Sequence, residues 1–526
     1  MSFLIVVVCS LFYLILQIKR NIHMLQQNFY NENNRYLKWG IKKISNMFNL
    51  VDVLIVVINF VNLFLQNNIL IWFNVVYLVI YFIQLKKERN NFYKLPLKVT
   101  SRIKRLCSTI GLIYVLLILW YNIWKDIYVF NLAYSLLVTL VFFVVYISNI
   151  LNVPLEKGVF LSYKFKAVKK LKMMDNLEVI GITGSYGKTS SKNVLNEILS
   201  VKFNPLATPA NFNTQYGLII TINNYINKFN DIFIAEMGAF KTGRIKLLCD
   251  LVKPKYGIIT SIGTAHLETF GSRENIQKGK FELIESLPSN GLAILNMDDP
   301  YQVNYKLRNN CEVIWIAIDN KEADVIASDI KVDANGMSFE VYFKKDKIHY
   351  KFFTKLLGKA NIYNILAAIA FGYYKGMTLD EIDIGVRRIK PVSHRLELKK
   401  SGNRVIIDDA YNSNPVGSKM ALEVLELMEG TKIVVTPGMI ELGDEQYSLN
   451  KKFGEYISEV ADYVILVGKE QTKPIVDGLN EKKYNKKNVF VINDVREAFK
   501  IIDGISSKDM KYILLENDLP DIFNEK

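Results

Sequence analysis

Long apolar stretches separated by polar loops dominate the first 150 residues of the chain. A helix needs about 20 apolar residues to cross the hydrocarbon core of a bilayer. Five stretches reach or nearly reach that length, at residues 2–17, 48–66, 69–84, 107–124 and 127–150. The first could instead be a signal peptide, although it lacks a basic leading segment and a small-residue cleavage site. The pattern predicts an α-helical, multi-span membrane region of five helices over residues 1–150.

Lysine and arginine residues are concentrated in two of the loops that connect these stretches. The loop after the first stretch and the loop after the third are rich in both, whereas the other two connections are short turns. Basic loops remain on the cytoplasmic side of a membrane. We therefore expect a multi-pass protein of the cell (inner) membrane, with its N-terminus outside and everything after residue 150 in the cytoplasm.

Three asparagines, Asn59, Asn62 and Asn74, fall within the predicted spans. Amide side chains at this depth either hydrogen-bond between helices or hold a lipid head group, and the sequence leaves both alternatives open. Asp52 lies at the edge of a span, and no acidic or basic residue lies at mid-span. The spans therefore carry no sign of a path for ions or protons.

The stretch VIGITGSYGKTSSKNVLNEIL at residues 179–199 changes from an apolar run to a glycine loop and then to helical spacing. Strand, glycine loop and helix in this order direct backbone N–H groups and a lysine at a phosphate group. The loop is shorter than the usual phosphate loop, whose first glycine would fall at position 182, an isoleucine here. The candidates for phosphate binding are Gly184, Ser185, Tyr186, Gly187, Lys188, Thr189 and Ser190.

Short apolar runs alternate with helical periodicity from about residue 175 onward. The runs at residues 232–235, 257–260 and 292–295 each end in polar residues, which is typical of buried parallel strands in a doubly wound sheet. Such sheets bind ligands at the carboxyl ends of their strands. The residues that follow the runs are therefore candidates for chemistry: Lys188, Thr189, Glu236, His266 and Asn296.

A second α/β pattern begins near residue 391, without a low-complexity linker before it. Its apolar runs cover residues 405–407, 433–436, 464–467, 489–492 and 512–515, and a hinge is expected at RRIKPVSHRLE. The predicted fold is thus an α-helical membrane region followed by α/β domains. Its parts are the membrane region at 1–150, a basic linker at 151–174, a doubly wound P-loop domain at 175–393 and a Rossmann-like domain at 394–526.

Composition narrows the class of protein further. The 526 residues are 50% hydrophobic and carry a formal net charge of +15. Much of that charge lies in the loops between apolar stretches, so membrane topology explains it better than nucleic-acid binding does. The four cysteines have no metal-ligand spacing and are expected to be reduced, unpaired thiols: Cys9, Cys107, Cys249 and Cys311.

Several long motifs resemble those of the Mur ligases, the ATP-dependent amide ligases that build the peptide of peptidoglycan. The loop GITGSYGKTSSK is similar to that family's shorter T-G-x-x-G-K-T phosphate loop, which accounts for the spacing. The resemblance covers about residues 175–526, and DDAYNSNP and GMIELG are closest to the members that add D-alanyl-D-alanine to a muramoyl-tripeptide. The other motifs follow in the family's order: TPANFNTQYG, IAEMGAFKTGRI, TSIGTAHLETFGSRENIQKGKFELIESLP, AILNMDDP, GKANIYNILAAIA and HRLE.

The resemblance implies a reaction, cofactors and roles for named residues. An acceptor carboxylate would attack the γ-phosphate of ATP, and an amine would displace phosphate from the resulting acyl phosphate. Lys188 would hold phosphate in the central ATPase domain. Mg²⁺, with two ions expected, would be held by Thr189, Glu236, His266 and, once carbamylated, Lys280. The other ATP-binding candidates are Asn296, Asn361, Asn364, Arg395 and Asp409, and the acceptor-binding candidates are Asn211, Asn213 and Thr214.

Some of these side chains also have simpler explanations. Glu236 could be an ordinary strand-end carboxylate, and His266 could cap a helix or pack in the core. Lys280 could pair with an acidic neighbour on its own helix. The pattern alone does not separate Asp408 from Asp409, although register with the family favours Asp409.

The chain departs from the family at its front, where membrane helices stand in place of the domain that grips a UDP-sugar. The acceptor is therefore expected to be a UDP-linked or a lipid-linked muramoyl peptide, with a poly-γ-glutamate-type chain as an alternative. The amine would be an amino acid or a dipeptide. The sequence leaves the identity of the amine open, because the chain departs from the family pattern at Ala360, Asn450 and LLENDLPD. A P-loop ATPase that drives a transporter is a third hypothesis, but no LSGGQ-like signature supports it.

Overall fold

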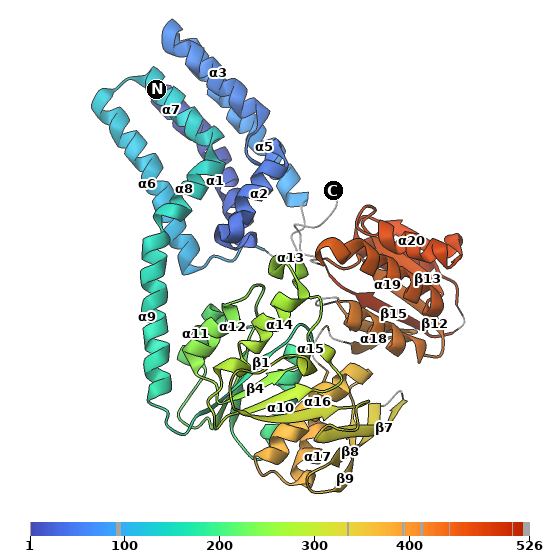
Figure 1. The fold of residues 1–526 in the computed structure, drawn as a ribbon. Coiled ribbons are helices and arrows are strands. Elements are labelled where there is room, and N and C mark those ends of the chain that lie inside the picture. Colours follow the sequence, from blue (N-terminus) through green and yellow to red (C-terminus); the bar gives the residue numbers. More distant parts are fainter. Residues whose placement is uncertain are drawn as a thin grey trace. The chain divides into compact units, whose positions relative to one another are not determined.

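The computed structural model describes residues 2–90, 96–333, 336–391, 394, 396–410, 414–440, 442–507 and 509–518. The chain divides into two compact units, an N-terminal unit at Met1–Leu161 and a C-terminal unit at Ser162–Leu519. Over its described residues the N-terminal unit is built from helices. The C-terminal unit contains two α/β domains, each built on one sheet (Figure 1).

Apolar helices make up the N-terminal unit. Among the described residues, three helices are long and apolar enough to cross a membrane, namely Val6–Gln27, Asn68–Arg89 and Ser101–Trp124. A fourth crossing is available if Ile127–Thr139 and Val141–Leu151, which meet at a bend of 79°, form one span. Leu50–Leu65 is apolar but shorter, with 16 residues, so the fifth crossing stays a prediction. The elements are α1 (Ser2–Gln27), η1 (Phe29–Asn34), α2 (Arg35–Lys42), η2 (Ile44–Asn46), α3 (Leu50–Leu65), α4 (Asn68–Ile71), η3 (Trp72–Val75), α5 (Val76–Asn90), α6 (Ser101–Trp124), α7 (Ile127–Thr139) and α8 (Val141–Leu151).

Polar side chains bond these apolar helices to one another. The amide of Asn131 on α7 donates to Asn59 Oδ1 on α3 at 2.8 Å, and its oxygen accepts from Asn74 in η3 at 3.1 Å. Between α1 and α3, the Tyr13 hydroxyl donates to an Asp52 carboxylate oxygen at 2.6 Å. All five side chains are buried, so Asn59 and Asn74 serve in interhelical hydrogen bonds, one of the two alternatives that the sequence left open.

The segment predicted as a basic linker forms one helix, α9 (Val153–Lys172). Lys169, Lys170 and Lys172 lie in its last turn, where cations interact favourably with the negative end of the helix dipole. Lys170 also donates to the backbone carbonyl of Asn223 at 3.1 Å. Within the C-terminal unit, the end of this helix is thus tied to the first α/β domain.

The first α/β domain has a sheet of nine strands in the order β2-β3-β1-β4-β5-β6-β7-β8-β9. Neighbours from β2 to β7 are parallel, and β7, β8 and β9 pair antiparallel. The predicted strands at 232–235, 257–260 and 292–295 are β3, β4 and β5, whereas the extension from β6 to β9 was not predicted. The strands are β1 (Glu178–Thr183), β2 (Pro205–Ala207), β3 (Ile232–Glu236), β4 (Tyr256–Ile259), β5 (Leu292–Asn296), β6 (Glu312–Ala317), β7 (Val325–Asp333), β8 (Gly336–Phe343) and β9 (Ile348–Thr354).

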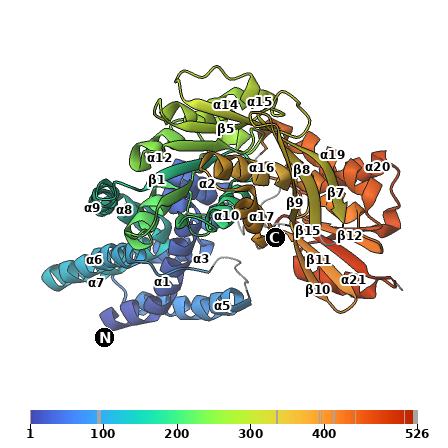
Figure 2. The ribbon, with the colours of Figure 1, turned by 90° about the horizontal axis from the view of Figure 1, so that it is seen from below.

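Alternation along β1, which lies between β3 and β4, explains why helices cover both faces of this sheet. Ile180 and Ile182 join a core that includes residues of α10, α16 and α17, which lie together in Figure 2. Gly181 points the other way, towards Leu283 and Met237, which a Cβ at this position would crowd. The doubly wound prediction is confirmed. The helices are α10 (Lys188–Leu199), α11 (Gln215–Asn224), α12 (Arg244–Val252), α13 (Leu267–Phe270), α14 (Arg273–Phe281), η4 (Ile284–Ser286), α15 (Pro300–Val303), α16 (Lys359–Tyr374) and α17 (Leu379–Arg388).

The second α/β domain has a six-stranded sheet in the order β10-β11-β15-β12-β13-β14. All neighbours are parallel except β10 and β11, and separate apolar clusters pack on the sheet. This is the Rossmann-like domain that the sequence predicts. Its elements are β10 (Glu397–Ser401), β11 (Arg404–Asp409), α18 (Pro415–Glu426), β12 (Thr431–Thr436), η5 (Gly443–Glu445), α19 (Gln446–Val460), β13 (Tyr463–Val467), α20 (Lys473–Glu481), η6 (Lys486–Asn488), β14 (Val489–Ile492), α21 (Val495–Gly504) and β15 (Lys511–Glu516).

Candidate active site

The glycine loop lies between the end of β1 and the start of α10, as the sequence predicts. Gly187 is the N-cap of α10 and has a φ of 78°, a conformation that favours glycine. The Lys188 side chain folds back over the loop, and its Nζ donates to Gly184 O at 2.7 Å and to Ser185 O at 3.1 Å. Because the first N–H groups and the positive dipole end of α10 face this loop, the loop suits an anionic phosphate group.

Tyr186 clasps the glycine loop to the loop that follows β4. Its hydroxyl accepts from Thr264 N at 3.0 Å and lies 2.9 Å from Thr264 Oγ1. Ser185 Oγ accepts from Gly263 N at 2.9 Å, and a Cβ on Gly263 would collide with the Tyr186 ring. Burial raises the pKa of the Tyr186 phenol, which keeps its proton. The clasp fixes the segment that leads to His266, two residues after Thr264.

Glu236, at the end of β3, is the centre of a buried polar cluster. Its Oε1 accepts from Thr189 Oγ1 and from Asn213 Nδ2, both at 3.1 Å. Its Oε2 lies 3.1 Å from the ammonium of Lys192 on α10. Glu236 is 1% exposed and Lys192 is 2% exposed. The cluster therefore joins the phosphate helix, the neighbouring strand and the segment that contains Asn213.

Two oxygens of this cluster fit a magnesium ion. With Mg–O bonds of about 2.1 Å, adjacent ligands of an octahedral ion lie about 2.9–3.0 Å apart. Thr189 Oγ1 and Glu236 Oε1 are 3.1 Å apart. Over the described ranges, no group of three or more His, Cys, Asp or Glu side chains could hold a metal ion. At a nucleotide site Mg²⁺ takes one or two protein ligands and completes its shell with phosphate and water.

Lys280, on α14, is a buried amine near the same end of β3. Its Nζ donates to Ala239 O at 3.4 Å and lies 5.5 Å from the centroid of the Phe270 ring. Burial, with a smaller effect of nearby Lys188, lowers the pKa of Lys280 well below its ordinary value. Its neighbour Glu282 instead accepts from backbone N–H groups at the start of α12. The burial and the lowered pKa of Lys280 therefore favour the neutral form of its amine.

The remaining predicted residues differ in their positions. His266 is half-buried at the start of α13, with a left-handed φ of 62°. Asn213 contacts Glu236, whereas Asn211 is exposed. Thr214 is the N-cap of α11 and accepts from the Gly217 N–H at 3.3 Å, which is a structural role.

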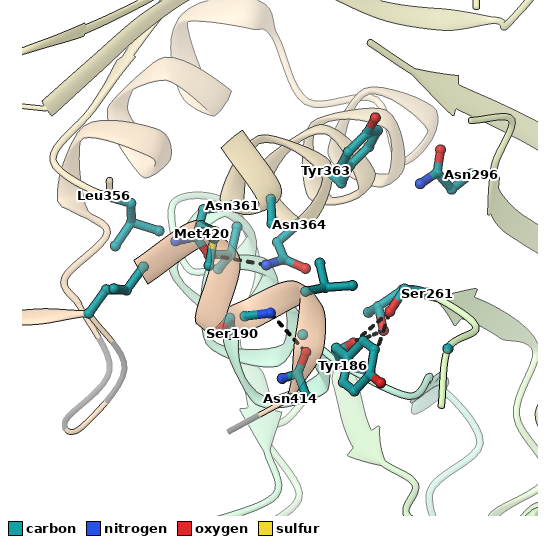
Figure 3. Close-up of a pocket in the computed structure, with 18 of the residues that line it drawn as sticks. Tyr186, Ser190, Ser261, Asn296, Leu356, Asn361, Tyr363, Asn364, Asn414 and Met420 are labelled. Carbon is teal, nitrogen blue, oxygen red and sulfur yellow. Dashed lines mark hydrogen bonds between the residues drawn. The ribbon is translucent and has the colours of Figure 1, made fainter. Parts of the chain in front are cut away.

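A cavity of about 620 Å³ lies beside the glycine loop, a volume typical of a small-molecule site (Figure 3). On one wall, Asn364 Oδ1 accepts from Ser191 Oγ at 2.7 Å, and Asn364 Nδ2 donates to Asn361 Oδ1 at 3.2 Å. The first bond holds α16 against α10, and the second, within α16, orients the Asn364 amide. The cavity gathers most of the predicted nucleotide-binding residues: Tyr186, Gly187, Ser190, Asn296, Asn361, Asn364 and Asp409.

Asp409 lines this cavity from the second α/β domain, together with three acidic residues of the first domain, Glu197, Asp298 and Asp299. Its neighbour Asp408 is buried and lies 2.6 Å from Lys399 Nζ and 2.8 Å from His394 Nδ1. Burial alone would raise the pKa of Asp408, but these two partners lower it below its usual value. The structure thus assigns a structural ion pair to Asp408 and supports Asp409 at the cavity. The predicted Arg395 lies outside the described residues.

Three features of the site were not predicted. They are the Lys192 ion pair, the Tyr186 clasp and the wall that Met420 contributes to the cavity (Figure 3). For Lys192 a signal was available, because it follows Lys188 by four residues on the same helix and so shares its face.

The fold and the site define a P-loop nucleotide-binding α/β protein. It has a doubly wound sheet, a glycine loop with a lysine at a helix start, and a hydrogen-bonded pair formed by Thr189 at the start of α10 and Glu236 at the end of β3. Sequence comparison makes the class specific. Residues 182–372 match the Mur ligase middle domain, and residues 394–514 match the Mur ligase, glutamate ligase domain. The chain belongs to the Mur ligase family.

Individual relatives agree with this assignment. The chain is 34% identical over 295 residues to the UDP-N-acetylmuramoyl-tripeptide–D-alanyl-D-alanine ligase of Bacillus subtilis, covering 55% of this chain and 63% of the relative. The enzyme of that name from Buchnera aphidicola is 33% identical over 326 residues, 60% of this chain and 71% of the relative. The chain therefore spans less than two thirds of the Bacillus relative's length. The crystal structure of MurF ligase from Thermotoga maritima in complex with ADP superposes with a TM-score of 0.61 at 25% identity, covering 69% of this chain and 81% of that one.

Proposed function

We propose that this chain is an ATP-dependent amide ligase that activates a carboxylate as an acyl phosphate and joins it to an amine. The cluster at Glu236 carries this proposal. It connects the phosphate helix, through Thr189, to the segment of Asn213, which the family resemblance assigns to the acceptor. A phosphate-binding group and an acceptor-binding group that share one carboxylate are suited to transfer phosphate from ATP to the acceptor.

Phosphoryl transfer depends mainly on positioning and on neutralised charge. Lys188 and the N–H groups of the glycine loop would hold the β- and γ-phosphates. Thr189 and Glu236 would hold Mg²⁺, with His266 nearby, and the ion would supply positive charge to the phosphate oxygens. The acceptor carboxylate would attack the γ-phosphorus, releasing ADP. The amine would then attack the acyl carbon, and phosphate would leave with the bonding electron pair.

Lys280 would carry a carbamate in the working enzyme. The neutral amine attacks CO₂ and loses one proton, which yields a carboxylate-like group on the side chain. Its burial and its lowered pKa support this step, since only the unprotonated amine has a lone pair to donate. A carbamate at this position would add an oxygen ligand for a second magnesium ion.

The names of the relatives favour D-alanyl-D-alanine as the amine and a muramoyl-tripeptide as the acceptor, a step of peptidoglycan synthesis. A second candidate acceptor is a lipid-linked muramoyl peptide. The three or four helices able to cross a membrane favour it, because they would hold the enzyme where such an acceptor lies. In either case we propose a multi-pass protein of the cell membrane, with residues 1–150 in the bilayer and the domains at 175–393 and 394–526 in the cytoplasm.

The test is ATP-dependent phosphate release by the detergent-purified chain. UDP-MurNAc-tripeptide and its lipid-linked counterpart would each be offered with and without D-Ala-D-Ala, with Glu236→Gln as the inactive control. Release that requires both the UDP-linked acceptor and the dipeptide supports the first assignment. Release only with the lipid-linked acceptor selects the second. No release in any combination would refute both muramoyl assignments.

A further inference from the structure

Lys192 is a fully buried lysine to which neither the motifs nor the phosphate loop assigns a role. Its side chain is 2% exposed. The ammonium donates to the backbone carbonyl of Ala210 and lies 3.1 Å from Glu236 Oε2. A buried ammonium is costly unless it is paired and hydrogen-bonded, so these two contacts explain how Lys192 remains inside the domain.

Two side chains of α10 contact the Glu236 carboxylate, one at each oxygen, because of their spacing along the helix. Thr189 and Lys192 are three residues apart, so they lie on one face of the helix, one turn apart. The Thr189 hydroxyl contacts Oε1, and the Lys192 ammonium contacts Oε2. The two oxygens are therefore not equivalent, and Oε1, at 3.1 Å from Thr189 Oγ1, has the spacing that adjacent magnesium ligands require.

Lys192 also fixes the start of the segment that reaches Glu236 from the other side. Ala210, whose carbonyl it binds, has a left-handed φ of 44°. Three residues later, Asn213 Nδ2 donates to Glu236 Oε1. One ammonium thus holds both the carboxylate and the turn that delivers Asn213 to it.

We infer that Lys192 is a positioning residue of the metal and acceptor site: it holds Glu236 through Oε2 so that Oε1 faces Thr189 Oγ1, the pair of oxygens that fits magnesium. The inference rests on the proposed function, of which it specifies one part. Groups that orient a metal ligand from behind change metal affinity by about 10–100-fold when they are removed. The loss of Lys192 is accordingly expected to weaken magnesium binding without changing the affinity for nucleotide alone.

The experiment measures the affinity of the detergent-purified full chain for ADP by calorimetry, with and without Mg²⁺. In Lys192→Met, the factor by which Mg²⁺ tightens ADP binding should fall by about tenfold or more, while ADP affinity in EDTA stays within twofold. The matched control is Lys375→Met. It removes one of the two lysine partners of another carboxylate, Glu178 at the start of β1: Lys375 Nζ lies 2.5 Å from Glu178, and Lys255 Nζ lies 2.9 Å from it. This control should lose stability and keep the full magnesium effect.

Lys192→Gln guards against a variant that fails to fold, because it keeps a neutral donor and most of the volume. If the Met variant unfolds, the Gln variant tests the inference instead. It is expected to lose less of the magnesium effect on ADP binding than the Met variant would. An unchanged or stronger magnesium effect in the folded variant overturns the inference and leaves the proposed ligase intact. A wild-type chain that binds ADP without any magnesium effect overturns the metal site itself, and with it the inference.

Discussion

Gly187 allows the phosphate loop to be tested without knowledge of the substrate. Replacing it by alanine puts a side chain into a left-handed conformation, with φ of 78°, at a cost of about 1–2 kcal/mol. The new Cβ would also lie 2.9 Å from Asn364 Oδ1. If Asn364 shifts, it loses the 2.7 Å bond from Ser191 Oγ, which is worth about 0.5–1.5 kcal/mol. Gly187→Ala is thus expected to cost about 1.5–3.5 kcal/mol.

Gly243 provides the matched control for this substitution. It is the N-cap of α12, has φ of 82°, and has open space where a Cβ would stand. Gly243→Ala therefore carries only the conformational part of the cost. The two variants should differ by about 1 kcal/mol, which corresponds to about 2–4 °C in melting temperature for a domain of this size. Thermal unfolding of the detergent-purified chain measures that difference.

ADP binding supplies the second measurement for the same pair of variants. Gly187 and Asn364 both line the cavity, so a shift of Asn364 by the new methyl group should weaken ADP binding. A loss of 1.4 kcal/mol corresponds to about tenfold in the dissociation constant. Gly243→Ala should bind ADP as the wild type does. Equal melting temperatures and equal ADP affinities in the two variants would refute the assignment of this loop and cavity to the nucleotide.

Four further predictions concern separate parts of the chain. Lys188→Ala should abolish ATP-dependent phosphate release and leave the melting temperature within about 2–4 °C of wild type; unchanged release would contradict the mechanism. Because the pKa of Lys280 is lowered, the unfolded chain binds more protons than the folded chain up to pH 10.5, so stability rises with pH. Between pH 7 and 10, the melting temperature of the wild type should therefore increase relative to that of Lys280→Met. Melting temperatures that change with pH in the same way for both proteins would contradict the lowered pKa of Lys280. Asp408→Asn should lower the melting temperature and leave ADP affinity unchanged, whereas Asp409→Asn should weaken ADP binding and leave the melting temperature unchanged. If Asp408→Asn weakened ADP binding and Asp409→Asn lowered the melting temperature, the roles assigned to the two carboxylates would have to be exchanged. Asn131→Leu removes two interhelical bonds of about 0.6 kcal/mol each, so a chain that melts in detergent as the wild type does would argue against them.

Much of the fold was predictable because it depends on local periodicity. Apolar runs of membrane-spanning length became helices, and the runs before Glu236 and Asn296 became the buried parallel strands β3 and β5. Two features escaped prediction. The helix predicted at 127–150 breaks into two segments at 79°, and the sheet extends through β6 to β9. Neither follows from periodicity, since a bend and an edge extension depend on the packing partners of each segment.

The sequence by itself determined the class of elements, their order and the phosphate loop, because residues a few positions apart specify a strand, a glycine turn and a helix start. Only the tertiary structure decided which residues, far apart in the chain, contact the same buried carboxylate. Lys192 and Asn213 meet Glu236 from two different segments, and His394 and Lys399 occupy Asp408, which leaves Asp409 at the cavity. A buried carboxylate must find its partners wherever the fold places them, and no spacing along the chain encodes that choice.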